Sequence, residues 1–265
     1  MRRDGLALAR LRGALIALAL AGGLAAPAAR AQEAVGIGSL PPAPQAVKNL
    51  TLLSIPSATV APRGLGFGSL GLTSKRGGTG NDWDGSMALG VGLGNAAEGL
   101  GLQITANITS LSNNFGDSGY FEAKIARLIA PGDSPLYIAA QVEGLARWGQ
   151  ASTVPERGRI MGTWFTDLSA GGDVFPLMVT LGYGTHLRNG RTDPGIFAGA
   201  GIGLTRNLGV SAAWTGETLD VGAAWRFEGA PGMTVSAEIN DVTDRLGSRR
   251  FSITFSFLRP NLYRS

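Results

Sequence analysis

A strict two-residue alternation near the C-terminus constrains the fold of this chain most. In the stretch RRFSITFSF, residues 249–257, apolar residues alternate with Ser and Thr. Successive side chains of a β-strand point to opposite sides, so the stretch predicts a strand with one aromatic face and one hydroxyl face. A membrane barrel turns the aromatic face to lipid, whereas a soluble sheet buries it against a second layer. The aromatic face consists of Phe251, Ile253, Phe255 and Phe257.

The same alternation recurs in short segments separated by clusters of Gly, Asn, Asp and Pro, which is typical of strands joined by turns. We expect twelve strands, and the irregularity of the first and the sixth leaves ten as the alternative. Their lengths are close to the ~9–11 residues that a tilted strand needs to cross a bilayer. The expected strands are 64–74, 84–94, 99–111, 119–129, 135–148, 159–169, 175–187, 195–205, 208–216, 218–228, 232–242 and 249–258.

The polar face of these strands favours an enclosed space over bulk water. It carries Gly, Ala, Ser, Thr, Gln and Asn with sparse charges of both signs, whereas a soluble sandwich usually shows many Lys and Glu to water. The other face has almost no charge, and its exposure to water would favour aggregation. Closure in a membrane removes both the apolar exposure and the free edges. The pattern therefore predicts an all-β fold, a single closed antiparallel transmembrane β-barrel, with a soluble exported β protein as the alternative.

The first 31 residues are typical of a secretory signal peptide. Four arginines precede the apolar run GALIALALAGGLAA, and Ala29-Arg30-Ala31 offers a small-x-small cleavage site. The segment holds five Arg and one Asp, so its removal changes 23 basic and 19 acidic residues to 18 of each. Charge therefore gives no argument for a nucleic-acid partner. The chain has no Cys, which excludes disulfides and thiolate metal centres.

Four parts are expected along the chain: a signal peptide at 1–31, a Pro-rich periplasmic lead-in at 32–57, an outer-membrane barrel at 58–258 and a C-terminal tail at 259–265. The lead-in has little periodicity. Short turns such as NAAEG, APGDSP and EGAPG are expected to face the periplasm. The loops at 75–84, 149–158 and 188–194 are expected to face outward.

The polar positions of these strands are candidates for lining the lumen. An eight-stranded barrel is filled by side chains and a porin of sixteen strands holds an aqueous channel, so a barrel of about twelve is intermediate. Inward charges of mixed sign could pair as a structural network or could line a pore. The candidate lumen-facing residues are Gln103, Asn107, Glu122, Lys124, Gln141, Glu143, Arg147, His186, Asp220, Arg226, Glu238 and Asn240.

Three features of the sequence bear on binding or catalysis. RGGTGNDWDG, 76–85, is a single copy of a calcium-binding repeat that works only when stacked, so it favours a polar loop. GAGIGL, 199–204, lacks the helix that follows a nucleotide-binding loop, and its alternating glycines predict an inward row beside Phe197 with room for an inward-folded loop or a passing solute. His186 is the only histidine, and no serine lies in a recognisable nucleophile motif. We expect no enzyme, metal ion or cofactor.

The opening of the expected barrel and one late hairpin carry short motifs. In LLSIPSATVAPRGLGFGSLGLTSK, 52–75, PSA is followed by AP-G and then by the first strand, and the hairpin is WTGETLDVGAAWRF, 214–227. Both stretches resemble the YjbH-type family of outer-membrane β-barrel proteins linked to exopolysaccharide production. The resemblance implies an accessory part in surface polysaccharide secretion and identifies no catalytic residue.

The expected function is therefore that of an outer-membrane β-barrel, a narrow channel or an accessory factor in the passage of surface polysaccharide or a solute. The alternatives are a plugged structural or adhesive surface barrel and a barrel enzyme acting on lipids. The expected partners are outer-membrane lipid, the barrel assembly machinery, which recognises terminal strands like 249–257, and a polysaccharide or small solute, but no nucleic acid.

Overall fold

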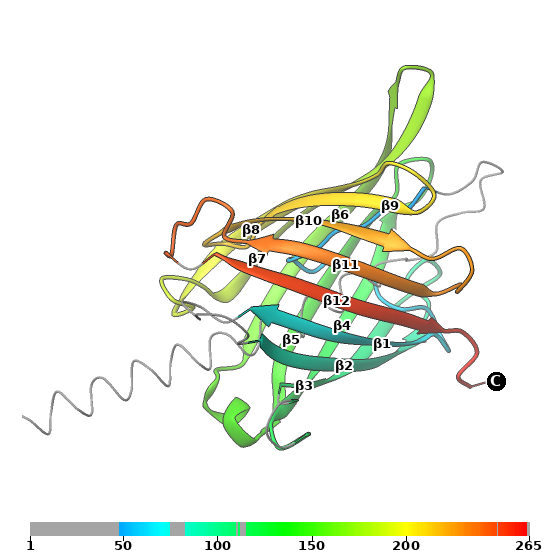
Figure 1. Cartoon of the computed structure of the whole chain (residues 1–265). Helices are drawn as coiled ribbons and strands as arrows, with labels where there is room; N and C mark the ends of the chain where they lie inside the picture. The colour runs from blue at the N-terminus through cyan, green and yellow to red at the C-terminus, as the bar shows by residue number, and fades with distance from the viewer. Residues whose placement is uncertain (1–47, 75–82, 110, 112–114, 248, 264–265) are drawn as a thin grey trace, which may run out of the picture.

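The computed structural model shows a closed antiparallel barrel of twelve strands (Figure 1). Each strand pairs with its neighbours in sequence, and β1 pairs with β12, so the sheet has no free edge. The barrel predicted from the alternation is confirmed, and the ten-strand alternative is wrong. The structure describes residues 48–263 except 75–82, 110, 112–114 and 248. Within that part of the chain, no helix is both long enough and apolar enough to cross a membrane.

The strand ends lie within three residues of the predicted bounds, and a short 3₁₀ turn, η1, interrupts the loop after β5. The strands are β1 Gly66–Ser74, β2 Trp83–Gly94, β3 Gly101–Ile108, β4 Gly119–Ala130, β5 Leu136–Trp148, β6 Arg157–Ala170, β7 Asp173–Arg188, β8 Asp193–Gly203, β9 Leu208–Trp214, β10 Leu219–Arg226, β11 Met233–Asn240 and β12 Arg250–Arg259, with η1 at Gly149–Thr153.

The outer face of the barrel is apolar. On β12, Phe255 is 48% exposed, whereas the side chain of the preceding Thr254 is buried inside. The same alternation on other strands leaves large aliphatic side chains exposed outside, among them Leu89, Ile160 and Leu181. Two stacked layers would have buried these residues, so the soluble sandwich is excluded. An apolar exterior around a closed barrel is the surface that a bilayer requires.

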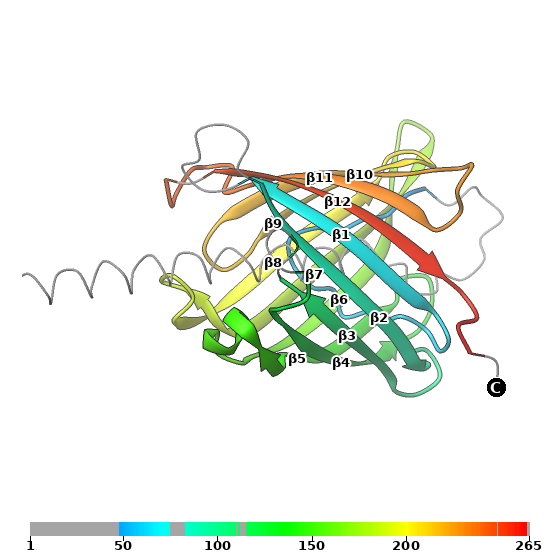
Figure 2. The same cartoon turned by 60° about the horizontal axis from the view of Figure 1, so that its bottom comes forward.

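The two ends of the barrel carry different connections. With an even number of strands, β1 begins and β12 ends at one end, which we call the terminal end (Figure 2). The turns predicted to be periplasmic lie there, at 95–100, 131–135 and 227–232. The opposite end, which we call the loop end, carries the connections at 149–156 and 189–192, so the two loops that were expected to face outward share one end. The predicted loop and repeat motif at 75–84 fall mostly outside the described residues.

Residues 48–62 lie inside the barrel, which corrects two expected boundaries. Residues 48–57 were expected in a periplasmic lead-in and 58–65 partly in the wall, but the wall begins at Gly66. Leu52, Leu53 and Ile55 are almost completely buried. The blue segment runs within the ring of strands in both views (Figures 1 and 2). The segment shows no alternation because it adds no strand to the sheet. We call residues 48–62 the plug.

Candidate functional site: the plugged lumen

The plug enters the lumen at the terminal end, beside β8, β9 and β10. The backbone N–H of Asn49 donates to the carbonyl of Thr205 at 2.7 Å. The side-chain amide of Asn49 donates to the carbonyls of Asn207 and Ala224, at 2.8 and 3.0 Å. The guanidinium of Arg226 donates to Oδ1 of Asn49 at 2.9 Å. Asn49 therefore joins the plug to the ends of the strands at this side.

The plug turns back near the middle of the lumen. The N–H of Leu53 donates to Oγ of Ser211 on β9 at 3.2 Å. Ser54 has a φ of 72°, a left-handed conformation that suits a sharp change of direction. Its hydroxyl donates to Oε2 of Glu238 on β11 at 2.5 Å. The turn is thus held by an inward carboxylate of the wall.

From the turn the plug crosses to β4 and β6 and then returns to the terminal end. Lys124 Nζ donates to the carbonyl of Ser57 at 3.3 Å. The N–H of Ala58 donates to the hydroxyl of Thr163 at 2.7 Å. The N–H of Ala61 donates to Oε1 of Gln103, near the start of β3, at 2.9 Å. The plug is therefore a U that enters and leaves at the same end of the barrel.

The plug and the wall also share an apolar core, unusual for the inside of a barrel. Leu52, Ile55, Ala58 and Val60 belong to one buried cluster with wall side chains that include Met161, Phe165, Met178 and Phe197. Complete burial of one Leu or Ile side chain stabilises by about 1.5–3 kcal/mol. Three such side chains in the plug give a gross stabilisation of roughly 5–9 kcal/mol, before the entropy of ordering the segment is subtracted.

Inward glycines allow the plug backbone to approach the wall. A Cβ at Gly201 would lie 1.7 Å from the carbonyl oxygen of Thr51, and one at Gly209 would lie 2.0 Å from that of Asn49. On the opposite wall, a Cβ at Gly92 would lie 2.0 Å from the carbonyl oxygen of Ala61. The sequence predicted an inward glycine row that leaves room for a folded loop or a solute. In this structure the occupant is a folded loop.

On the β5 and β6 side, the lumen wall carries a buried charge cluster. Arg157 and Arg159 each approach Oε1 of Glu143 at 3.1 Å. Glu143 is 3% exposed, and Glu122 and Tyr120 on β4 are buried beside it. Both arginines were missed from the sequence. Their alternation with Gly158 and Ile160 was the available signal, but a loop was expected up to residue 158.

A second polar cluster lies on the lumen wall near the loop end of β10 and β11. Asp220 accepts from the N–H of Asp241 at 2.8 Å and from the amide of Asn240 at 3.3 Å. Asn240 in turn accepts from the hydroxyl of Ser252 at 2.8 Å. These bonds fix the start of the β11–β12 loop to the wall. Asp220 and Asn240 therefore have a structural role in this conformation.

Most of the predicted lumen residues lie on the inner face. The buried ones are Gln103, Asn107, Glu122, Lys124, Gln141, Glu143, Asp220, Glu238 and Asn240. Arg226 is partly buried beside Asn49. Among the described residues, neither amide atom of Asn107 has a hydrogen-bond partner, and the same holds for Oε1 of Gln141. These buried amide atoms have a hydrogen-bonding capacity that the described protein groups do not use.

The other two predicted residues lie at the loop-end rim rather than deep in the lumen. Arg147 binds the carbonyl of Val154 and lies 3.6 Å from Glu156, so it fastens the β5–β6 loop. His186 lies within a register irregularity of β7, between Gly184 and Arg188, and its Nδ1 lies 3.2 Å from the carbonyl oxygen of Arg191. Within the described part of the chain, no serine or carboxylate binds His186. No group of three or more His, Asp or Glu that could hold a metal ion occurs among those residues.

No protein-family model and no curated protein matches this chain. Several solved outer-membrane barrels have a similar fold. The KdgM porin in complex with disordered oligogalacturonate gives a TM-score of 0.47 at 10% identity, over 73% of this chain and 98% of that chain. Omp33 of Acinetobacter baumannii gives a TM-score of 0.43 at 9% identity, over 75% of this chain and 99% of that chain. An outer membrane channel from Pseudomonas putida F1 gives a TM-score of 0.42 at 10% identity, over 76% of this chain and 97% of that chain. Similarity this distant does not bear on the function of this chain.

Proposed function

We propose that this protein is a non-enzymatic outer-membrane channel that its own N-terminal segment holds closed. The observation that carries the proposal is the U-shaped plug inside a closed barrel with an apolar exterior. A barrel of twelve strands is wider than one filled by wall side chains alone, so removal of the plug would leave a lumen for a hydrophilic solute.

The plug contacts favour a closed resting state. Six backbone or side-chain groups of the plug bind side chains of the wall, at Asn49, Leu53, Ser54, Ser57, Ala58 and Ala61. Together with the buried Leu and Ile side chains, these bonds make spontaneous opening rare. A bias of about 5.5 kcal/mol already changes a two-state ratio by about 10⁴. Opening therefore requires a partner, a pulling force or a solute that binds the open form.

The solute class is a surface polysaccharide segment or a small hydrophilic molecule. Neutral amides such as those of Asn107 and Gln141 suit the hydroxyl groups of sugars, because an amide both donates and accepts. The motif that resembles the YjbH-type family, 52–75, comprises most of the plug and β1. An accessory role in polysaccharide export would thus act through the plug.

Planar-bilayer conductance with a reversible lock tests the channel. The chain has no cysteine, so Ala58→Cys and Thr163→Cys introduce a single pair at the contact where Ala58 N–H lies 2.7 Å from the Thr163 hydroxyl. The variant that lacks residues 48–62 should conduct steadily, and the full chain should open only rarely. The oxidised cysteine pair should not conduct until a reductant is added. Thr163→Cys alone is the matched control, since it cannot form the bond.

The second candidate is a permanently plugged structural barrel, and the apolar anchoring of the plug favours it. In that case the reduced pair and the full chain never conduct, even when the deletion variant does. A deletion variant that folds but never conducts would contradict the channel. Folding is checked by heat-modifiable migration of the membrane fraction on a denaturing gel.

A further inference from the structure

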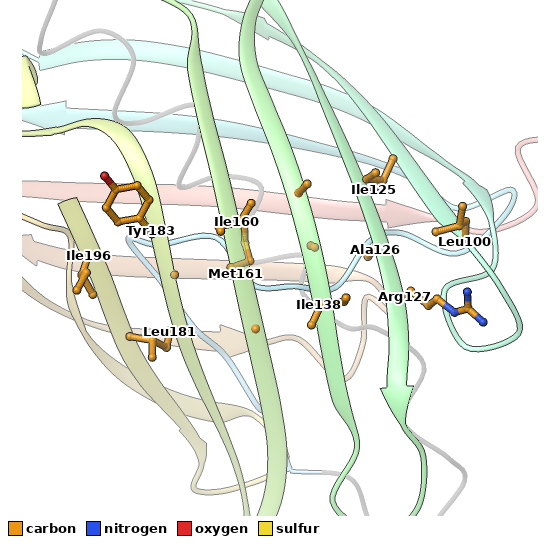
Figure 3. A pocket seen from close by; sticks show the side chains of 14 residues that line it. Leu100, Ile125, Ala126, Arg127, Ile138, Ile160, Met161, Leu181, Tyr183 and Ile196 are labelled. Carbon is orange, nitrogen blue, oxygen red and sulfur yellow. The ribbon is translucent and has the colours of Figure 1, made fainter. Parts of the chain in front are cut away.

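A groove on the outside of the barrel is separate from the lumen. It crosses β4 to β8, and its volume is about 760 Å³. Figure 3 shows Ile125, Ile138, Ile160, Leu181 and Ile196 around it. Its lining is almost wholly apolar, and its size is within the roughly 300–1,000 Å³ of small-molecule pockets.

The groove arises from small residues within two rows of outward side chains. In one row Ala140 pairs with Ile160, and in the next Ile138 pairs with Gly162. Ala140 and Gly162 thus lie diagonally across from each other, and their small size leaves a depression between Ile138 and Ile160. Five strands spaced about 4.8 Å apart give a length near 19 Å, comparable with half of the ~30 Å hydrocarbon core. This length accommodates one extended acyl chain.

A polar pocket adjoins the groove at the loop end. The two share Tyr183 and Ile196 in their linings, and the rim pocket has a volume of about 530 Å³. Its lining includes Arg188 and Arg245. The guanidinium of Arg245 lies over the ring of Trp214, 5.4 Å from its centroid, which is within the range of a cation–π contact.

The remaining charge in the rim pocket does not neutralise both arginines. Glu217 lines the same pocket and accepts from the backbone N–H of Gly190 at 3.0 Å. Arg188 Nε donates to the carbonyl of Pro194 at 2.8 Å and leaves its terminal nitrogens for an anion. The pocket thus carries two cations and one anion at the edge of an apolar groove. An arginine pair of this kind suits phosphate, which accepts charge-assisted hydrogen bonds.

We propose that this continuous surface binds one phosphorylated acyl lipid of the outer leaflet, with an acyl chain in the groove and a headgroup phosphate between Arg188 and Arg245. The proposal rests on the outer-membrane placement proposed above but not on the plug or on conduction. In the outer leaflet of an outer membrane, the lipid that combines several acyl chains with phosphate is lipid A. A bound lipid would brace the hairpin β7–β8 at its exposed tip.

Binding of purified lipid A to the detergent-solubilised full chain tests the proposal by native mass spectrometry and by titration. Arg188→Gln with Arg245→Gln, and separately Gly162→Leu, should each weaken lipid A binding about tenfold. The nearest atoms to a Cβ at Gly162 are 3.8 Å away or more, so a larger side chain fills the groove without disturbing the wall. Ala223→Leu on the outer face of β10 and Arg206→Gln at the terminal end are matched controls and should bind as the parent does.

Three outcomes would overturn the lipid site while leaving the channel untouched. Equal binding in all variants indicates adsorption of lipid around the whole barrel. Phosphatidylethanolamine that binds as tightly as lipid A removes the preference expected from the arginine pair. Inorganic phosphate that displaces the lipid at equal concentration indicates an anion site without the acyl groove. Heat-modifiable migration is measured first for each variant, and Arg245→Gln alone replaces the double variant if the loss of Arg188 prevents folding.

Discussion

Two sides of the lumen are filled in different ways. On β8 to β10 the wall is glycine-rich, and the main chain of the plug lies directly against it, as at Gly201 and Gly209. On β3 to β6 the wall carries long polar side chains, which either reach across to the plug, as Lys124 does, or pair with each other, as Glu143 and Arg157 do. In the ring order, β7 separates the two groups of strands on one side, and β11, β12, β1 and β2 separate them on the other.

The difference separates two sources of stability. Much of the glycine side has small inward residues, with Phe197 an exception, so this side depends on the plug to fill the lumen. The charge cluster on the other side is paired within the wall, since Glu143 holds Arg157 and Arg159 without any contribution from the plug. A change on the glycine side should therefore move the plug, and a change in the charge cluster should weaken the barrel. A single cysteine at Ser57, buried in the plug, reports plug opening through its rate of reaction with a thiol reagent.

The largest effect is expected from Gly201→Val. The new Cβ would lie 1.7 Å from the carbonyl oxygen of Thr51, and neither backbone can move without breaking the sheet or the plug. We expect the plug to leave the lumen, the reporter at residue 57 to react as fast as in an unfolded peptide, and conductance to appear. Gly162→Val is the control, because that glycine faces outward with no atom closer than 3.8 Å. A closed Gly201→Val barrel would show that the glycines are not required for plug seating.

The glycine row could be predicted from the sequence, but its occupant could not. Alternation identified the inward face of each strand because side-chain direction in a sheet depends only on local spacing. The plug has no such period, and its burial depends on Ser211, Thr163 and other wall residues far away in the chain. The apolar content of LTLLSIP, together with the inward glycines, was the available signal. In a periplasmic segment these apolar side chains would stay exposed to water, whereas a lumen lined by glycines has room to bury them.

The next largest effect is expected from Glu143→Leu. It leaves Arg157 and Arg159 buried without their shared carboxylate, and removal of one partner of a buried ion pair costs about 3–5 kcal/mol. The urea midpoint of the barrel in detergent should fall, while reporter labelling in the plug stays unchanged. Glu156→Leu is the matched control, since its pair with Arg147 is 3.6 Å long and exposed, and such pairs contribute about 0–1 kcal/mol. Faster plug labelling in Glu143→Leu would remove the distinction between the two sides.

Leu52→Ala should have an intermediate effect on the plug. Leu52 is fully buried in the cluster shared with Phe197 and Met178. Loss of a buried leucine costs about 2–5 kcal/mol, which corresponds to reporter labelling about 30-fold faster or more. The urea midpoint of the wall should change much less than in Glu143→Leu. Leu100→Ala is the comparison at an exposed outer position, where neither measurement should move. Equal labelling in Leu52→Ala would indicate that polar bonds alone hold the plug.

The smallest effect is expected from Ser54→Ala, which breaks the bond between the turn of the plug and Glu238 on β11. A hydrogen bond to a charged group contributes about 1.5–3 kcal/mol, and the lower end applies because alanine leaves Glu238 its other interaction. Reporter labelling should rise about tenfold. Glu238→Gln keeps an acceptor but removes the charge, so it should give a smaller increase than Ser54→Ala. If both substitutions leave the labelling rate at the parent value, the turn is held by Leu52, Leu53 and Ile55 alone, and Glu238 has no part in closing the lumen.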